Sequence, residues 1–282
     1  MNQLYKVIGI SKQAVNRYNK REERFNMQLL PLIAEALRKE HPGCGVEKMY
    51  HVLRPTFIGR DRFIEIMMDM GFRLKKSKNF KRTTYAAKIY YPNLVKGINI
   101  SAPSTVWQSD ITYIRLGEKF YYAVFIIDVY TKKIVGYKLS SHMRAIANVE
   151  ALAMALRVHT APTIHHSDRG SQYACIEYIK LLTDNNTQIS MGLKAQENAY
   201  AERINKTIKE EYLGPWKARS YRQLKKQMTN AVNHYNHYRP HNHLRRLTPV
   251  EFEKKYFNDP QFKKPSFTIF DDNNIQKPVN LI

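Results

Sequence analysis

The sequence predicts an α/β protein in which a mixed five-stranded sheet follows a small all-α region. The chain has 282 residues, of which 43% are hydrophobic, so it can form an extensive buried core. The hydrophobic pattern also changes near Val106. Before this residue, apolar side chains recur at helical spacing, whereas after it they alternate or run continuously as they do in strands.

The β-rich part of the chain has a recognisable element order. Strands are expected at 107–116, 121–129, 132–140, 163–166 and 187–191, and helices at 144–159, 175–186 and 199–213. A turn at Gly117–Lys119 joins the first two strands, and the second strand reads as a buried central one. The order β-β-β-α-β-α-β-α is that of a ribonuclease-H-like domain, which we place at residues 104–215.

The flanking regions are expected to be largely helical. Helices at 26–39, 46–53 and 60–70, joined by tight turns, predict a helix-turn-helix-like DNA-binding region within residues 1–75. A separate short helical segment before residue 25 has Ser11 as a candidate N-cap. Residues 76–103 read as a basic, extended linker. Residues 216–282 read as a C-terminal extension, with a helix at 224–238, a capped turn at Thr248 and an irregular tail.

The charge of the chain is unevenly distributed. Its formal net charge is +22, made up of +12 in residues 1–100, +1 in residues 101–202 and +9 in residues 203–282. A basic surface kept for solubility would not explain a near-neutral centre. Basic flanks that bind phosphates on either side of an acidic site explain both facts, so the expected partner is an anionic polymer, which the resemblance described below implies is double-stranded DNA.

Cysteine content and hydropathy limit the class of protein. The two cysteines, Cys44 and Cys175, provide neither a disulfide framework nor a four-cysteine zinc site. No apolar run approaches the length of a membrane span, and the N-terminus lacks the core of a signal peptide. We therefore expect no membrane partner and a cytoplasmic location, associated with the nucleoid.

Three acids fall on the elements that phosphodiester chemistry requires. Asp110 interrupts an apolar strand, Asp168 follows the end of the fourth strand, and Glu202 lies on a helix. Carboxylates on different elements of one fold can hold two hard divalent cations about 4 Å apart. Singly, each acid has an ordinary structural explanation, and Asp128 is a rival because it also interrupts a strand.

Three motifs around these acids resemble a known family. WQSDITY at 107–113, HSDRGSQY at 166–173 and ENAYAE at 197–202 resemble the transposases encoded by the second reading frame of the IS3 family of insertion sequences. These belong to the retroviral-integrase superfamily. YNHYRPH at 235–241, with Leu244 and TPVE at 248–251, resembles the C-terminal signature of the family, and residues 35–72 resemble its helix-turn-helix-like region.

This resemblance implies a function and its cofactors. It implies that Asp110, Asp168 and Glu202 bind Mg²⁺ or Mn²⁺ in a two-metal site and catalyse 3′-end cleavage and strand transfer. It also implies a homo-oligomer on DNA and a first-frame partner that carries a helix-turn-helix and a leucine zipper.

The chain departs from the family pattern in one loop. The 33 residues between Asp168 and Glu202 are about two fewer than is usual in the family, and Glu197 stands where Asp is usual. The shortening keeps open the alternative of a catalytically decayed DNA-binding repressor. A second alternative is a ribonuclease-H-like nuclease acting on RNA–DNA hybrids, which would explain the three acids but not the two basic flanks.

Basic residues near the acids and in the linker are the expected DNA contacts. They would pair with backbone phosphates, which dominate nonspecific affinity for DNA. The candidates are Lys75, Lys76, Lys78, Lys81, Arg82, Arg169, Lys206, Lys209 and Arg239.

Overall fold

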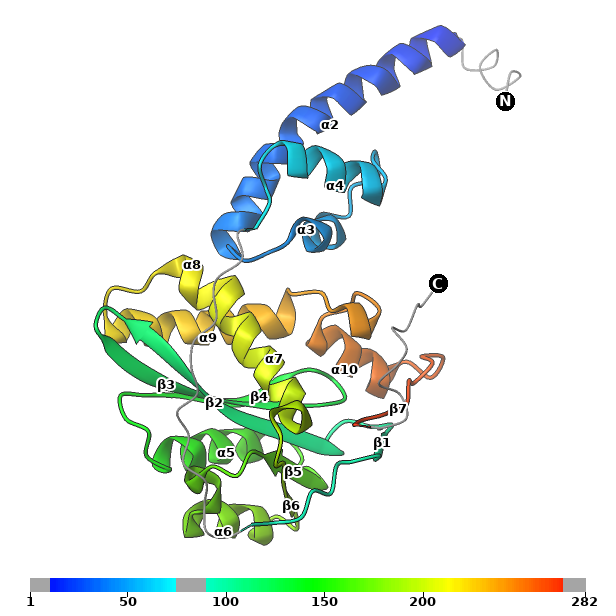
Figure 1. Ribbon diagram of the computed structural model, residues 1–282. Coiled ribbons are helices and arrows are strands. Elements are labelled where there is room, and N and C mark those ends of the chain that lie inside the picture. Colours follow the sequence, from blue (N-terminus) through cyan, green and yellow to red (C-terminus); the bar gives the residue numbers. More distant parts are fainter. Residues whose placement is uncertain (1–10, 75–89, 271–282) are drawn as a thin grey trace. The chain divides into compact units, whose positions relative to one another are not determined.

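A computed structural model describes residues 11–74 and 90–270 of the chain (Figure 1). The chain divides into two compact units, residues 1–76 and 77–282, and each has its own buried apolar core. In the described residues, no helix combines the length and the apolar character needed to cross a membrane.

Within residues 11–74, the first unit has three helices, as the sequence predicts. They are α2 (Lys12–Glu40), α3 (Val46–Leu53) and α4 (Arg60–Asp69). Leu30 and Ala34 of α2 pack with Met49 of α3 and with Phe63 and Met67 of α4. Figure 1 shows α3 and α4 against the C-terminal half of α2.

Helix α2 is longer than the sequence indicates. Two separate segments were expected on either side of residue 25, but one helix runs from Lys12 to Glu40 and passes through Pro31. Its start is as predicted, because Oγ of Ser11 accepts a hydrogen bond of 3.1 Å from the backbone N–H of Ala14. Pro31 lacks an N–H, but the burial of Leu30 and Ala34 on either side keeps the helix continuous.

The second unit contains the predicted five-stranded mixed sheet. Its strands are β2 (Val106–Leu116), β3 (Lys119–Asp128), β4 (Ile134–Ser140), β5 (Ile164–Ser167) and β6 (Gln188–Met191). The spatial order is β4-β3-β2-β5-β6, with β2, β3 and β4 antiparallel and β5 and β6 parallel to β2. This topology confirms the ribonuclease-H-like fold.

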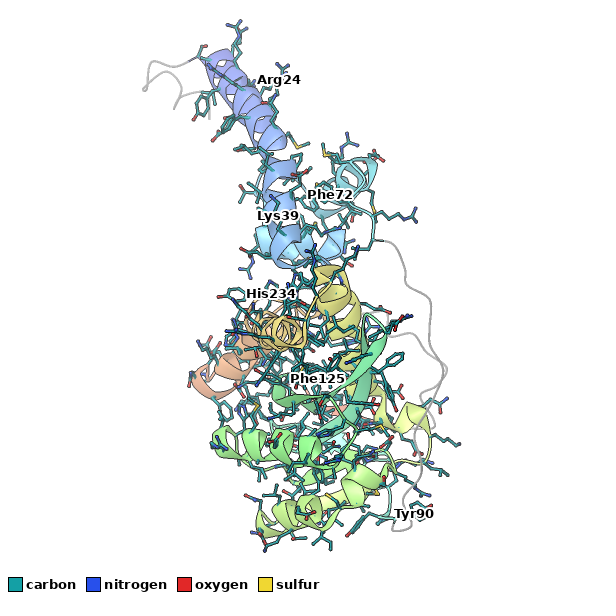
Figure 2. All side chains as sticks on the ribbon, turned by 90° about the vertical axis from the view of Figure 1, so that its left-hand side faces the viewer. Arg24, Lys39, Phe72, Tyr90, Phe125 and His234 are labelled. Atoms are coloured by element: carbon teal, nitrogen blue, oxygen red, sulfur yellow. The ribbon has the colours of Figure 1, made fainter. Side chains whose placement is uncertain are left out.

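Helices cover both faces of the sheet. One face carries α5 (Ile146–Val158) and α6 (Ile176–Asp184), and the other carries α7 (Ala199–Ile208) and α9 (Tyr221–His237) (Figure 1). Along β3, Phe125 packs towards α7 and α9, while Val124 and Ile126 pack towards α5. Figure 2 shows Phe125 in the interior of this unit.

Two short strands close the remaining edge of the core. β1 (Asn99–Ile100) pairs antiparallel with β7 (Phe267–Thr268). The hydroxyl of Tyr130 donates a 2.9 Å hydrogen bond to the carbonyl of Pro265, and its ring packs against Phe252 of α10 (Pro249–Asn258). The segments at 99–100 and 267–268 were expected to be an extended linker and an irregular tail, so this pairing is a correction.

Short helical turns complete the second unit. They are 3₁₀ turns at Ser171–Ala174, Ala195–Asn198 and Asn242–Leu244, a π-helical turn at Lys209–Leu213 and helix α8 (Gly214–Trp216). The predicted cap of α10 is confirmed. Oγ1 of Thr248 accepts from the N–H of Glu251 over 3.2 Å, and a Glu251 carboxylate oxygen accepts from the N–H of Thr248 over 2.9 Å.

Candidate active site

Parallel pairing of β2 with β5 brings the two candidate aspartates to neighbouring strands. The register matches Ser109 with Ser167; Asp110 is the next residue of β2, and Asp168 directly follows the end of β5. Adjacent strands lie about 4.8 Å apart. The two carboxylates therefore emerge from the middle of the sheet at the same level.

The loop after Asp168 folds back on its own carboxylate. Oδ1 of Asp168 accepts a 3.0 Å hydrogen bond from the backbone N–H of Gly170. A Cβ atom at position 170 would lie 3.0 Å from that oxygen and 3.1 Å from Oε1 of Gln172. A side chain at position 170 would therefore crowd both oxygens, which would have to shift by a few tenths of an ångström to admit it.

The pKa of Asp110 is raised by its surroundings, which include two other acids. Burial raises the pKa of Asp110, and the charges of Asp168 and Glu202 raise it further, to about 7. A hydrogen bond of 2.7 Å from Nδ2 of Asn205 to Oδ2 of Asp110 acts in the opposite direction but is outweighed. The three candidate acids are therefore coupled through space.

Glu202 lies in the first turn of α7 and is exposed. Its charge acts on Asp110 from the helix that also carries Asn205. Over residues 11–74 and 90–270, however, no three His, Cys, Asp or Glu side chains are arranged as an assembled metal site. The structure thus places Asp110 on β2 and Asp168 at the end of the neighbouring strand β5. The charge of Glu202 acts on Asp110, but the three carboxylates are not assembled as a metal site.

Buried amide side chains fix the start of α7 to β2. Oε1 of Gln108 accepts from the backbone N–H groups of Tyr200 and Ala201 over 3.2 and 3.4 Å. Nδ2 of Asn198 donates to the carbonyl of Ser109 over 2.9 Å. Gln108 is fully buried two positions before Asp110, and its place in the WQSDITY motif is the sequence signal that could have identified it.

The shortened loop before α7 is closed by Glu197. An Oε2 of Glu197 accepts hydrogen bonds from the N–H groups of Leu193 and Lys194 over 2.6 and 3.1 Å. Burial raises the pKa of Glu197, but these bonds and the neighbouring positive charges together bring it below its ordinary value. The residue that departs from the family pattern therefore holds the loop in place with an ionised carboxylate.

Asp128, the rival acid, has a structural role. It is almost fully buried and accepts hydrogen bonds from the N–H of Ser104 over 2.6 Å and from the N–H and hydroxyl of Thr131 over 2.8 and 3.0 Å. These donors occupy the carboxylate in the turn that follows β3. Asp128 is not part of the acidic cluster.

The two histidines before Asp168 are buried in the sheet. The hydroxyl of Tyr178 is 2.9 Å from Nε2 of His165, and Oγ of Ser190 is 2.8 Å from Nδ1 of His166. Burial is the main cause that lowers the pKa of His165 to about 3 and that of His166 to about 4. Both rings are therefore neutral at physiological pH and serve in the packing of the sheet.

Three of the candidate DNA contacts surround the acids. Lys206 is exposed on α7. Lys209 is half-buried; burial lowers its pKa, and the charge of Asp110 partly offsets this effect. Arg169 is half-buried, and its guanidinium carbon lies 4.5 Å from the centre of the Tyr90 ring. Lys75, Lys76, Lys78, Lys81 and Arg82 lie outside the described residues.

Arg239 differs from the other candidates. It is only 6% exposed and makes a bidentate ion pair with Glu211, with both N–O distances 2.8 Å. Its ring contact is with Tyr235, 5.5 Å away. Because this guanidinium is buried and paired with Glu211, we do not expect Arg239 to contact DNA.

The topology and the acidic cluster define an integrase core. Two family profiles described as integrase core domain match residues 101–196 and 184–249. The chain is also 31% identical over 193 residues to transposase InsF of insertion sequence IS3A from Escherichia coli K12. That match covers 66% of this chain and 67% of that protein. The chain belongs to the transposases of IS3-type insertion sequences.

Other relatives support this membership. A 31 kDa protein of insertion element IS600 from Shigella sonnei is 32% identical over 207 residues, which cover 71% of this chain and 76% of that protein. The transposase of IS904 from Lactococcus lactis is 30% identical over 246 residues, which cover 83% and 96%. The family is therefore shared along most of both chains.

Similarity also extends to solved structures. The catalytic core domain of HTLV-2 integrase in complex with magnesium (trimeric form) superposes with a TM-score of 0.47 at 17% identity. It covers 54% of this chain and 97% of that one.

Proposed function

We propose that this transposase cleaves the ends of its insertion sequence and joins their 3′ ends to target DNA with Asp110, Asp168 and Glu202. The observation that carries the proposal is the position of Asp110 and Asp168 at one level of β2 and β5, with the charge of Glu202 acting on Asp110. The membership in the IS3-type transposases supports the same assignment.

The donor set fits a pair of hard divalent cations, for which we propose Mg²⁺ or Mn²⁺. Three carboxylates from separate elements supply oxygen ligands of the kind these ions prefer. Burial and, after it, the charges of Asp168 and Glu202 raise the pKa of Asp110, and a bound cation would offset both effects. Two such ions would activate the attacking oxygen and stabilise the leaving oxygen.

The remaining site residues would position the three acids or bind the DNA. Asn205 fixes the Oδ2 side of Asp110, and Gln108 and Asn198 hold the start of α7 against β2. Arg169, Lys206 and Lys209 would bind DNA phosphates beside the acids, with Lys75, Lys76, Lys78, Lys81 and Arg82 extending this contact. Because Glu202 is exposed, we propose that it moves onto the metal pair when DNA binds.

The proposed partners follow from the substrate. Double-stranded DNA supplies the element ends and the target, and a homo-oligomer on DNA would hold two ends together. A first-frame helix-turn-helix and leucine-zipper protein would help to find those ends. We propose that the reaction takes place in the bacterial cytoplasm, at the nucleoid.

A strand-transfer assay with duplexes that carry the terminal repeats of the element tests the proposal. We expect Mg²⁺- or Mn²⁺-dependent 3′ cleavage and joining. Asp168→Asn should abolish both while DNA affinity stays unchanged. Asp184→Asn, which alters an exposed acid paired with Lys180 on α6, is the matched control and should remain active. Wild-type turnover by Asp168→Asn would refute the triad. Binding without cleavage by the wild type would favour the decayed repressor, and cleavage of RNA–DNA hybrids alone would favour the nuclease.

A further inference from the structure

Helix α2 carries a second apolar stripe that the first unit does not bury. Tyr18, Phe25 and Leu32 follow one another at intervals of seven residues and are 65%, 59% and 62% exposed. Further residues on the same side of the helix lie between them, so that the intervals along the chain alternate between three and four positions. We call the full set the α2 seam: Val15, Tyr18, Glu22, Phe25, Leu29, Leu32 and Ala36.

The seam lies on the opposite side of α2 from the face that packs within the unit. Leu30 and Ala34, which enter the core with α3 and α4, occupy the other side of the helical wheel. Figures 1 and 2 both show the first half of α2 beyond α3 and α4, and Figure 2 places Arg24 there. No described element of this unit covers the seam. An isolated helical segment has little stability in water. Packing against a partner would stabilise this half of α2.

The spacing identifies the partner as another helix. Alternating intervals of three and four give a repeat of 3.5 residues per turn, which keeps a stripe in register with a helix of the same repeat wound around it. Six of the seven seam positions are apolar. The α2 seam of a second copy has the same repeat, and the charges beside the seam decide how the two copies are oriented.

We propose that α2 pairs with α2 of a second copy in the antiparallel direction. In a parallel pair, Glu22 would face Glu22 of the second copy inside the seam, and Glu35 would lie beside Glu40 of the second copy. In an antiparallel pair with Phe25 opposite Leu29 of the second copy, Arg21 lies opposite Glu35 and Lys12 lies opposite Glu40. Each of these two opposite-charge pairs occurs twice by symmetry.

The same register also matches side-chain sizes across the seam. Tyr18 lies opposite Ala36 of the second copy, so the largest side chain meets the smallest. Glu22 lies opposite Leu32 of the second copy and no longer faces another carboxylate. Arg21, on the flank of the seam, is placed next to Glu22. This interaction is independent of the chemistry at Asp110, so it can be tested without DNA or metal.

Sedimentation equilibrium of the full chain, without DNA, tests the association. We expect a reversible monomer–dimer equilibrium. Phe25→Glu combined with Leu32→Glu should raise the dissociation constant at least about 100-fold, because four apolar side chains leave the interface. Phe257→Glu, at a 67% exposed phenylalanine of α10, is the matched control and should change nothing. A wild type that is monomeric at every concentration, or a seam variant that associates like the wild type, would overturn the proposal.

A charge exchange tests the direction of pairing. Arg21→Glu alone should weaken the dimer by roughly 3- to 10-fold at low salt, because two ion pairs become repulsive. Adding Glu35→Arg should restore the wild-type dissociation constant. In a parallel pair, Arg21 lies opposite Asn26 of the second copy and Glu35 lies beside Glu40, so Arg21→Glu alone would leave the dissociation constant nearly unchanged and Glu35→Arg alone would strengthen the dimer. Either result would show that the antiparallel arrangement is wrong.

Discussion

The side-chain amide of Asn205 donates a 2.7 Å hydrogen bond to Oδ2 of Asp110. Asn205 lies one turn after Glu202 on α7, and Asp110 lies in the middle of β2. This single bond therefore joins the helix that carries one candidate acid to the strand that carries another.

Replacing Asn205 should reduce activity more than stability. Asn205→Ala removes the donor that orients Asp110, and loss of such a supporting partner at a metal site typically lowers activity about 10- to 100-fold. Strand-transfer rates measured over a range of Mg²⁺ concentrations should show a weaker apparent affinity for the metal, with DNA affinity unchanged. Asn233→Ala, at an exposed asparagine of α9, is the control. Equal rates for both variants would show that the bond has no role in positioning.

Gln108 should be important for stability as well as for activity. Gln108→Leu leaves the N–H groups of Tyr200 and Ala201 at the start of α7 without their acceptor, which costs about 1–3 kcal/mol. Urea denaturation should show this loss, and hydrogen exchange should rise first at the start of α7. Gln223→Leu, at an exposed glutamine that accepts from the N–H of Arg219, should cost under about 1 kcal/mol. Similar losses in the two variants would contradict the anchoring role.

Arg239 should contribute to stability rather than to DNA binding. Arg239→Met leaves the carboxylate of Glu211 largely buried without its partner, which costs about 3–5 kcal/mol. The double variant with Glu211→Gln should recover much of this loss in thermal unfolding. The slope of DNA affinity against salt should be the same for the double variant and the wild type. A slope reduced by about one phosphate contact would return Arg239 to the DNA interface.

The acidic cluster should make the metal-free protein less stable as the pH rises. The pKa of Asp110 is raised to about 7 in the folded chain, so the native state favours the protonated carboxyl. Its stabilising contribution is complete below about pH 4 and is lost as the pH rises through 7.

Asp110→Asn removes this dependence. In chelator, the variant should gain about 1–3 kcal/mol over the wild type between pH 5 and pH 8. Urea unfolding at several pH values measures the difference, with Asp184→Asn as the control. Parallel pH profiles for wild type and Asp110→Asn would show that the pKa of Asp110 is not raised in the folded chain. Mg²⁺ should restore wild-type stability at pH 8.

Much of the second unit follows directly from the sequence. The alternation in β2 and the apolar run of β3 set both faces of the sheet, and the topology is as predicted. The expected positions of Asp110 on a central strand and Asp168 just after its neighbour are also found. These features depend on the spacing of apolar residues within single strands, which can be read directly from the sequence.

Other features depend on contacts that no local pattern records. β1 and β7 have two residues each and exist because they pair across the chain, and Pro31 stays helical because its neighbours are buried. Arg239 lies in a motif of polar residues that reads as surface, yet Glu211, 28 positions earlier, pairs with it inside the protein. Gln108 is functional only through the backbone of α7, which sequence spacing alone does not bring to it.

The pairing of β1 with β7 has a practical consequence for anyone who dissects this chain. A fragment cut at residues 104 and 215 would keep every candidate acid yet lose Ile100, Leu244, Phe252 and Ile269, which pack around Tyr130 and Val129. That apolar surface would face solvent and promote aggregation. The smallest soluble catalytic fragment should therefore span about residues 90–270, and insolubility of shorter pieces would reflect their truncation rather than any defect in the acids.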